Sequence, residues 1–155
     1  MPPPFLYDLT TVDFNKTLID VEGIRAIIPQ RYEMEMLSSI VHEDEGILIG
    51  MKELTDQEFW VRGHIPGRPL MPGVLMIECA AQLCAFYTMR KHPEMGFIGF
   101  ARCNDVIFRG TVIPPGRLYM ISKMMEITRR RAVGKCQGIY NGTLVFEATI
   151  TGMSI

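Results

Sequence analysis

The pattern of apolar and polar positions divides the chain into strand-like stretches on either side of one long apolar segment. Residues 37–54 form two β-rich stretches with a turn at residues 44–46, which predicts a hairpin. Four further strand-like stretches follow toward the C-terminus: 96–110, 118–131, 132–140 and 143–153. The last two are joined by Asn141-Gly142, a strong hairpin signal between β-rich stretches. Long strands on short turns predict an antiparallel sheet.

The segment between these two groups of strands predicts one long helix over residues 72–90. Pro72 suits a first helical position and Pro93 ends the pattern. Glu78 and Gln82 are the main interruptions of its apolar character. A helix that is apolar on nearly every side has to be enclosed. We therefore expect an α+β fold in which an antiparallel sheet curves around one central helix and a second copy of the chain completes the cover.

The remaining N-terminal part contributes little regular structure. Residues 20–28 predict a short helix that Asp20 caps and Pro29 ends. The residues before it have mixed polarity, with no basic stretch leading into an apolar one, so no signal peptide is expected. A chain of 155 residues favours one domain. We expect an N-terminal extension over residues 1–20 and a single domain over residues 21–155.

Composition excludes several classes of function. The net charge is −1, which indicates neither nucleic acid nor an anionic membrane surface as a partner. The apolar residues 74–89 fall short of the roughly 20 that a membrane span needs, and they include Glu78 and Gln82. No membrane span is therefore expected.

The cysteines form no CxxC pair and have no histidine cluster nearby, so no structural metal site is expected. The four are Cys79, Cys84, Cys103 and Cys136. Free cysteines behave as small apolar residues, and we expect reduced core thiols in a cytoplasmic protein.

Candidate chemistry concentrates between residues 64 and 82. Glu78 and Gln82 are four residues apart and share a helix face. Burial would disfavour the charged form of Glu78 and keep it protonated as a general acid. The alternative, in which both side chains are exposed to solvent along a narrow face of the helix, stays open at this point.

A histidine and a helix start complete this group. His64 comes before a loop stiffened by three prolines, and a neutral imidazole is the usual general base near neutral pH. The alternative is a histidine bound only to the loop backbone. Gly73 lies at the start of the predicted helix, where free N–H groups and the helix dipole can hold a developing oxyanion. A base, an acid and an oxyanion donor fit a β-elimination next to a carbonyl.

The stretch HIPGRPLMPGVLMIECAAQ, residues 64–82, resembles the signature of the bacterial β-hydroxyacyl-acyl-carrier-protein dehydratases of the hotdog-fold superfamily. The spacing from His64 to Glu78, both Pro-Gly pairs and the Ala-Gln pair agree with that signature. Residues 28–32 (IPQRY) and 108–114 (FRGTVIP) extend the resemblance.

The resemblance implies a hotdog fold and a role for each motif residue. His64 would abstract the α-proton of a 3-hydroxyacyl thioester on acyl carrier protein, and Glu78 would protonate the departing 3-hydroxyl. The amide of Gly73 would bind the thioester carbonyl, and Gln82 would orient Glu78. The product would be a trans-2-enoyl thioester of fatty-acid biosynthesis, formed without a metal or an organic cofactor.

The resemblance also implies an assembly. The histidine and the glutamate of one site come from different subunits of a homodimer, and dimers of this family often form hexamers as trimers of dimers. The chain departs from the family at Ile65, where phenylalanine is usual, and at Gln30, where histidine is usual. Neither departure removes a catalytic group, and both bear on acyl specificity.

Two other functions remain open. A hotdog thioesterase would use a carboxylate to activate water and would not need the stiff loop after His64. A non-catalytic acyl-binding dimer would be free to lose His64 or Glu78, and both residues are present.

Overall fold

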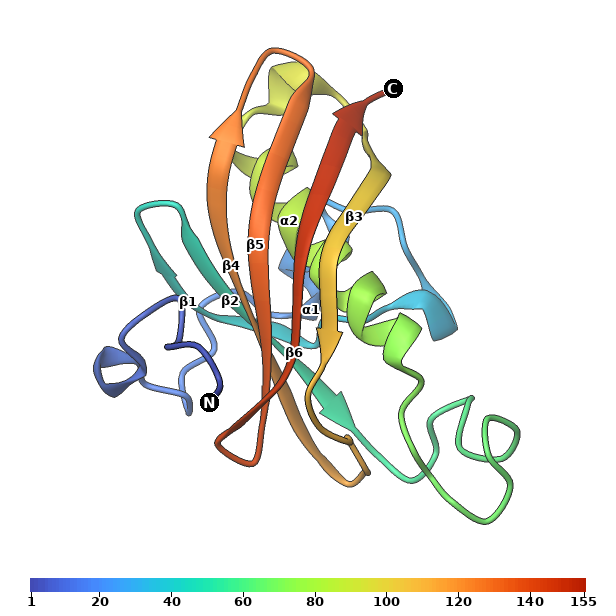
Figure 1. The fold of residues 1–155 in the computed structure, drawn as a ribbon. Helices are drawn as coiled ribbons and strands as arrows, with labels where there is room; N and C mark the ends of the chain where they lie inside the picture. Colours follow the sequence, from blue (N-terminus) through green and yellow to red (C-terminus); the bar gives the residue numbers. More distant parts are fainter.

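The computed structural model describes residues 1–155 and shows one antiparallel sheet wrapped against one long helix (Figure 1). The six strands are β1 (Ser39–Asp44), β2 (Ile47–Leu54), β3 (Ile98–Phe108), β4 (Gly116–Ile127), β5 (Arg131–Tyr140) and β6 (Thr143–Ser154). The helices are α1 (Val21–Arg25), α2 (Gly73–Lys91) and the 3-10 turns η1 (Leu9–Thr11), η2 (Tyr32–Met34) and η3 (Pro93–Met95). The predicted antiparallel sheet around a central helix is confirmed.

The strand order in the sheet is β1-β2-β4-β5-β6-β3. The predicted hairpins are present: Gly46 adopts φ 71° between β1 and β2, and Asn141 and Gly142 adopt φ 51° and 74° between β5 and β6. Such positive φ values match the twist of paired strands in tight hairpins. Strand β3 follows α2 in the chain yet pairs with β6, so it forms one edge of the sheet.

Helix α2 agrees with the predicted helix over residues 72–90 to within one residue at each end. Pro72 occupies the N-cap position with extended backbone, and its carbonyl accepts a hydrogen bond from the N–H of Leu75 at 3.0 Å. The helix therefore begins at Gly73, one residue later than predicted. Pro93 opens η3 after the helix ends.

The core lies between α2 and the inner face of the sheet. Side chains of the helix that are completely buried include Cys79, Ala80, Leu83 and Phe86, and they belong to one cluster with Leu118, Met120 and Phe146. Burying a large apolar side chain is worth about 1.5–3 kcal/mol. The opposite side of the helix is less covered, since Val74 is 67% exposed and Glu78 is only partly buried.

The N-terminal residues cover the outer face of the sheet. Leu6, Tyr7, Leu9, Val12 and Phe14 pack against a cluster formed by Val41, Ile47, Ile49, Ile121 and Ile139. The buried amide of Gln137 accepts from the N–H of Leu6 at 2.7 Å and donates to the carbonyl of Pro4 at 3.0 Å. The division of the chain at residue 20 stays a prediction, because packing onto a sheet does not define a domain boundary.

Helix α1 is shorter than the predicted helix over residues 20–28. Asp20 caps it as expected, since its carboxylate accepts from the N–H of Gly23 at 3.0 Å. The helix ends at Arg25, because Ile27 bonds back only three residues to Ile24 and the turn tightens. No helix in the structure combines the length and the apolar character that crossing a bilayer requires.

Candidate active site

The side chains of Glu78 and Gln82 both lie on α2, and the amide of Gln82 holds the carboxyl of Glu78. Gln82 is only 2% exposed, and its Nε2 donates to Glu78 Oε1 at 2.8 Å and to the carbonyl of Met34 at 2.6 Å. Its Oε1 accepts from the N–H of Met36 at 3.0 Å. Both amide hydrogens and the amide oxygen are thus in use, so neither Gln82 nor Glu78 is free to turn.

Glu78 opens into a small cavity of about 60 Å³ between α2 and the sheet. Gln30 and Gln82 line this cavity, and most of the other lining side chains are apolar, including Ala81, Ala85, Phe97, Ile98, Phe100 and Ile150. This volume has room for a few water-sized groups, since about 10–15 Å³ suffices for one water. The carboxyl is therefore neither fully buried nor on an open, solvent-exposed face of the helix. It faces a narrow space with apolar walls.

His64 lies on the segment between β2 and α2, which extends away from the sheet and the helix (Figure 1). Its side chain is exposed, and its Nδ1 lies 2.7 Å from the carbonyl oxygen of Leu70. A carbonyl only accepts, so Nδ1 carries the hydrogen in the neutral ring and the lone pair is on Nε2. The loop backbone therefore does bind His64, and the same bond leaves Nε2 as the basic nitrogen.

The loop that carries His64 is anchored at both ends. Trp60 and Met71 are 4% and 2% exposed, and the N–H of Met71 donates to the carbonyl of Val112 at 2.9 Å. The N–H of His64 donates to the carbonyl of Trp60 at 2.9 Å. The residues that line the cavity of Glu78 do not include His64, so a single chain does not bring the two groups into one cavity.

Gly73 begins α2, and its N–H has no acceptor within the chain. The ring of Phe108, at the end of β3, lies directly against it: a Cβ at this position would be 2.8 Å from Phe108 Cε1. Real Cβ atoms do not approach so closely, so a larger residue at this position would have to displace the ring. The free N–H at a helix start can bind an oxyanion. The sequence reasoning included Phe108 in the family resemblance but gave it no role.

The sequence of the chain matches a known protein family. A family model described as the FabA-like domain matches residues 28–149, which include Glu78, Gln82, His64 and Gly73. The chain belongs to the FabA-like family. The resemblance noted in the sequence is thereby confirmed.

Relatives of this FabA-like chain agree on one enzyme class. It is 34% identical over 134 residues to the 3-hydroxyacyl-[acyl-carrier-protein] dehydratase FabZ of Clostridium botulinum, covering 85% of this chain and 93% of that protein. It is 33% identical over 132 residues to FabZ of Herpetosiphon aurantiacus, covering 84% and 94%. The protein is an enzyme of this dehydratase class, as the motif predicted.

Solved structures agree on the fold of this FabA-like protein. The dehydratase heterocomplex ApeI:P of Xenorhabdus doucetiae superposes with a TM-score of 0.73 at 10% identity, covering 85% of this chain and 90% of that one. Cj0977 of Campylobacter jejuni, a sigma28-regulated virulence protein, superposes with a TM-score of 0.69 at 13% identity, covering 93% and 96%. These likenesses confirm the predicted hotdog fold.

Three of the four thiols of this FabA-like protein have a raised pKa. Burial raises the pKa of Cys79 to about 12, and its Sγ donates to the carbonyl of Met36 at 3.3 Å. The Sγ atoms of Cys84 and Cys136 lie 3.5 Å apart, and that contact together with burial raises the pKa of Cys136. Burial also raises the pKa of Cys103. A thiol with a raised pKa is a weak nucleophile near neutral pH. Cys79, Cys84 and Cys136 are buried core residues, and Cys103 is partly buried.

Proposed function

We propose that this protein removes water from 3-hydroxyacyl thioesters of acyl carrier protein and forms trans-2-enoyl thioesters in fatty-acid biosynthesis. The observation that carries the proposal is the Glu78 carboxyl, which Gln82 fixes toward a small and mostly apolar cavity. Its family supports the same reaction, because the FabZ relatives are named as 3-hydroxyacyl-acyl-carrier-protein dehydratases.

Each candidate residue has one role in this reaction. His64 Nε2 takes the α-proton, and the electron pair of that C–H bond forms the C2–C3 double bond. Glu78 gives its proton to the 3-hydroxyl, and the C3–O bond breaks to release water. Protons are then balanced, since His64 ends with one more and Glu78 with one fewer, and solvent exchange restores both. Each proton-transfer group contributes about 10²–10⁴ in rate.

The start of α2 would stabilise the charge that develops on the thioester oxygen. The N–H of Gly73 has no partner in the chain, and it lies at the positive end of the helix dipole. Such a donor acts most strongly where it meets charge only in the transition state. Gln82 would keep the carboxyl of Glu78 oriented toward the substrate through its 2.8 Å hydrogen bond.

The complete site would contain two chains. His64 is exposed on a projecting loop, and the edge strand β3 exposes Phe100, Ile107 and Phe108 at 48%, 43% and 50%. A long apolar edge strand invites pairing with another strand. A homodimer would cover it and bring His64 of one subunit to Glu78 of the other. Hexamers of three such dimers are the further assembly that the family resemblance implies, and we place the enzyme in the cytoplasm.

Mixing two inactive variants tests both the roles and the dimer. We expect His64→Ala and Glu78→Gln each to lose nearly all enoyl-thioester formation, followed as the rise in absorbance of the conjugated product. Refolding the two together should restore about a quarter of the wild-type rate, because half of randomly formed dimers are mixed and each mixed dimer holds one intact site.

Two outcomes would overturn parts of this proposal. No recovery in verified mixed dimers would place both groups of a site in one chain. Release of free carrier thiol without enoyl product from the wild-type protein would favour the thioesterase alternative. Binding of the acyl chain with neither product would favour the non-catalytic one.

A further inference from the structure

The side chain of Gln30 carries a buried acceptor that nothing in the chain satisfies. Its Oε1 is inaccessible to solvent and has no hydrogen-bond partner. The residue lines the same cavity as Glu78 and Gln82. A buried acceptor without a partner lowers stability, so a polar side chain kept at such a position indicates a partner that is not part of the chain.

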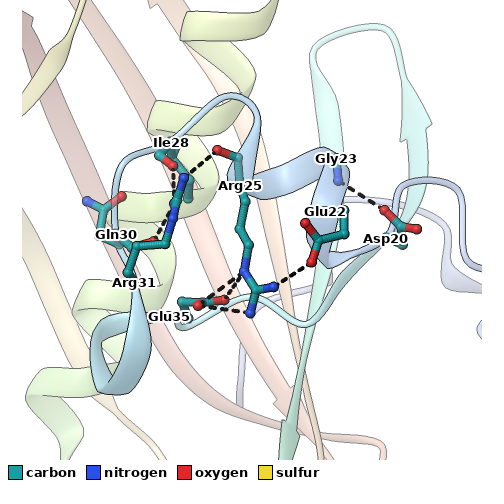
Figure 2. A network of polar contacts seen from close by, with 8 residues as sticks. All are labelled: Asp20, Glu22, Gly23, Arg25, Ile28, Gln30, Arg31 and Glu35. Atoms are coloured by element: carbon teal, nitrogen blue, oxygen red, sulfur yellow. Dashed lines mark hydrogen bonds and ion pairs between the residues drawn. The ribbon is translucent and has the colours of Figure 1, made fainter.

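The backbone that presents Gln30 is held firmly (Figure 2). Arg31 Nη1 donates to the carbonyls of Ile28 at 2.9 Å and Gln30 at 2.7 Å, and its Nη2 donates to the carbonyl of Arg25 at 2.9 Å. Arg25 in turn forms an ion pair with Glu35 at 3.0 Å. Figure 2 shows the amide of Gln30 pointing away from these groups. The main chain is therefore fixed while the side chain takes no part in the network.

The other polar side chains of the cavity are already in use. Gln82 makes three hydrogen bonds, and Thr88 Oγ1 donates to the carbonyl of Cys84 at 2.8 Å. Among the amides and hydroxyls of the lining, Gln30 is thus the side chain whose acceptor has no partner in the chain.

We propose that the side chain of Gln30, which makes no hydrogen bond in the chain, turns its Oε1 into the cavity and binds the leaving 3-hydroxyl of the substrate and then the water that this hydroxyl becomes. The inference rests on the proposed dehydration. Before reaction, the hydroxyl donates its own hydrogen to Gln30 and turns an oxygen lone pair toward Glu78, the proposed general acid. When the C3–O bond breaks, the oxygen takes the proton of Glu78 and keeps its original hydrogen on Gln30.

The product explains why two acceptors are needed. Water has two O–H donors that point in different directions, so when one of them faces the carboxylate of Glu78 the other needs a separate acceptor. In a mostly apolar cavity of about 60 Å³ the second hydrogen would otherwise be unpaired. Gln30 supplies the second acceptor, so that the departing molecule is stabilised while it leaves.

Gln30→Met tests the inference because it keeps the length of the side chain and removes the acceptor. We expect kcat/KM for a 3-hydroxyacyl thioester to fall about tenfold to a hundredfold. We also expect Tm to stay the same or to rise by about 2 to 4 °C, because an unsatisfied buried acceptor has been removed. A merely structural role would lower Tm. The matched control is Gln57→Met, at an exposed position, which should change neither value.

A binding comparison isolates the hydroxyl. The comparison uses the His64→Ala protein, which prevents turnover. With Gln30 intact, this protein should bind a 3-hydroxyacyl thioester about tenfold more tightly than the saturated acyl thioester of equal length. Gln30→Met should abolish that preference. Gln30→Asn should abolish it too, because the amide is drawn back by one methylene, and this milder variant serves if the Met variant does not fold.

The outcomes separate this inference from the proposed function. Full activity and full hydroxyl preference in both Gln30 variants would overturn the role of Gln30 while the wild-type protein still dehydrates its substrate. A wild-type protein that forms no enoyl product from any 3-hydroxyacyl thioester would overturn the proposed function itself.

Discussion

Glu78 and His64 occupy opposite settings in the same chain. Glu78 lies on an enclosed helix, and its carboxyl is held by a buried amide that also bonds the backbone near η2. His64 lies exposed on a projecting loop, and one carbonyl orients its ring. The proposed acid is therefore held by a buried side chain, whereas the proposed base is only oriented by its own loop.

Because of this difference, substitutions near Glu78 and at His64 should affect stability and activity to different extents. Changing a residue next to Glu78 disturbs buried hydrogen bonds, so it should affect both the folded state and the reaction. Changing His64 removes an exposed ring with a single polar contact, so it should affect the reaction alone.

The largest effect is expected for His64→Ala. The rate of dehydration should fall by about 10²–10⁴, because the base is lost. The free energy of unfolding in urea should change by less than about 0.5 kcal/mol, because the position is exposed. A loss of stability above that value would show that the loop depends on the imidazole, and the contrast with Glu78 would disappear.

A large effect on stability is expected for Gln82→Leu. The substitution leaves the N–H of Met36 and the carbonyl of Met34 without their partner, at a cost of about 2–4 kcal/mol in the free energy of unfolding. Dehydration should also fall, because the carboxyl of Glu78 loses its fixed orientation. Urea unfolding and the enoyl-thioester assay measure the two effects.

Gln137→Leu is the matched comparison for Gln82→Leu. This second buried glutamine bonds two main-chain groups of the N-terminal segment, Leu6 and Pro4, on the face of the sheet away from α2. It should lose stability while retaining the activity of the folded protein. Equal activity losses in the two variants would mean that the bond from Gln82 to Glu78 has no special role.

The smallest effect is expected for Gly73→Ala. The new methyl would meet the ring of Phe108 at 2.8 Å, and this half-exposed ring has room to move. We expect a loss of about 1 kcal/mol in the free energy of unfolding. Adding Phe108→Leu should recover much of that loss in a double-mutant cycle. Wild-type stability in Gly73→Ala alone would show that the contact is loose.

Local sequence signals were sufficient for most of the secondary structure. The central helix was predictable because a continuous apolar segment lies between prolines, and its start was misplaced by one residue because Pro72 is extended and serves as the cap. The hairpin at Asn141 and Gly142 was predictable because both positions need positive φ. The pairing of β3 with β6 was not, because it joins strands that are far apart in the chain.

The candidate site was also only partly predictable from the sequence. The motif residues could be named from spacing and family resemblance, but the burial of Glu78 could not be decided from a helix that is apolar on nearly every side. Gln30 was noticed only as a departure from the family pattern. Its approach to the cavity of Glu78 depends on how the turn after α1 packs, which no local pattern reports.

By itself, the sequence determined the helix and the hairpins and gave the candidates for an acid, a base and an oxyanion donor, because backbone preferences and side-chain chemistry are local properties. Only the tertiary structure decided which side of the helix stays open, which main-chain groups hold the amide of Gln82 and which ring nitrogen of His64 bonds the loop. Those choices depend on hydrogen bonds and packing between segments, some of them more than forty residues apart, that meet only when the sheet closes around α2.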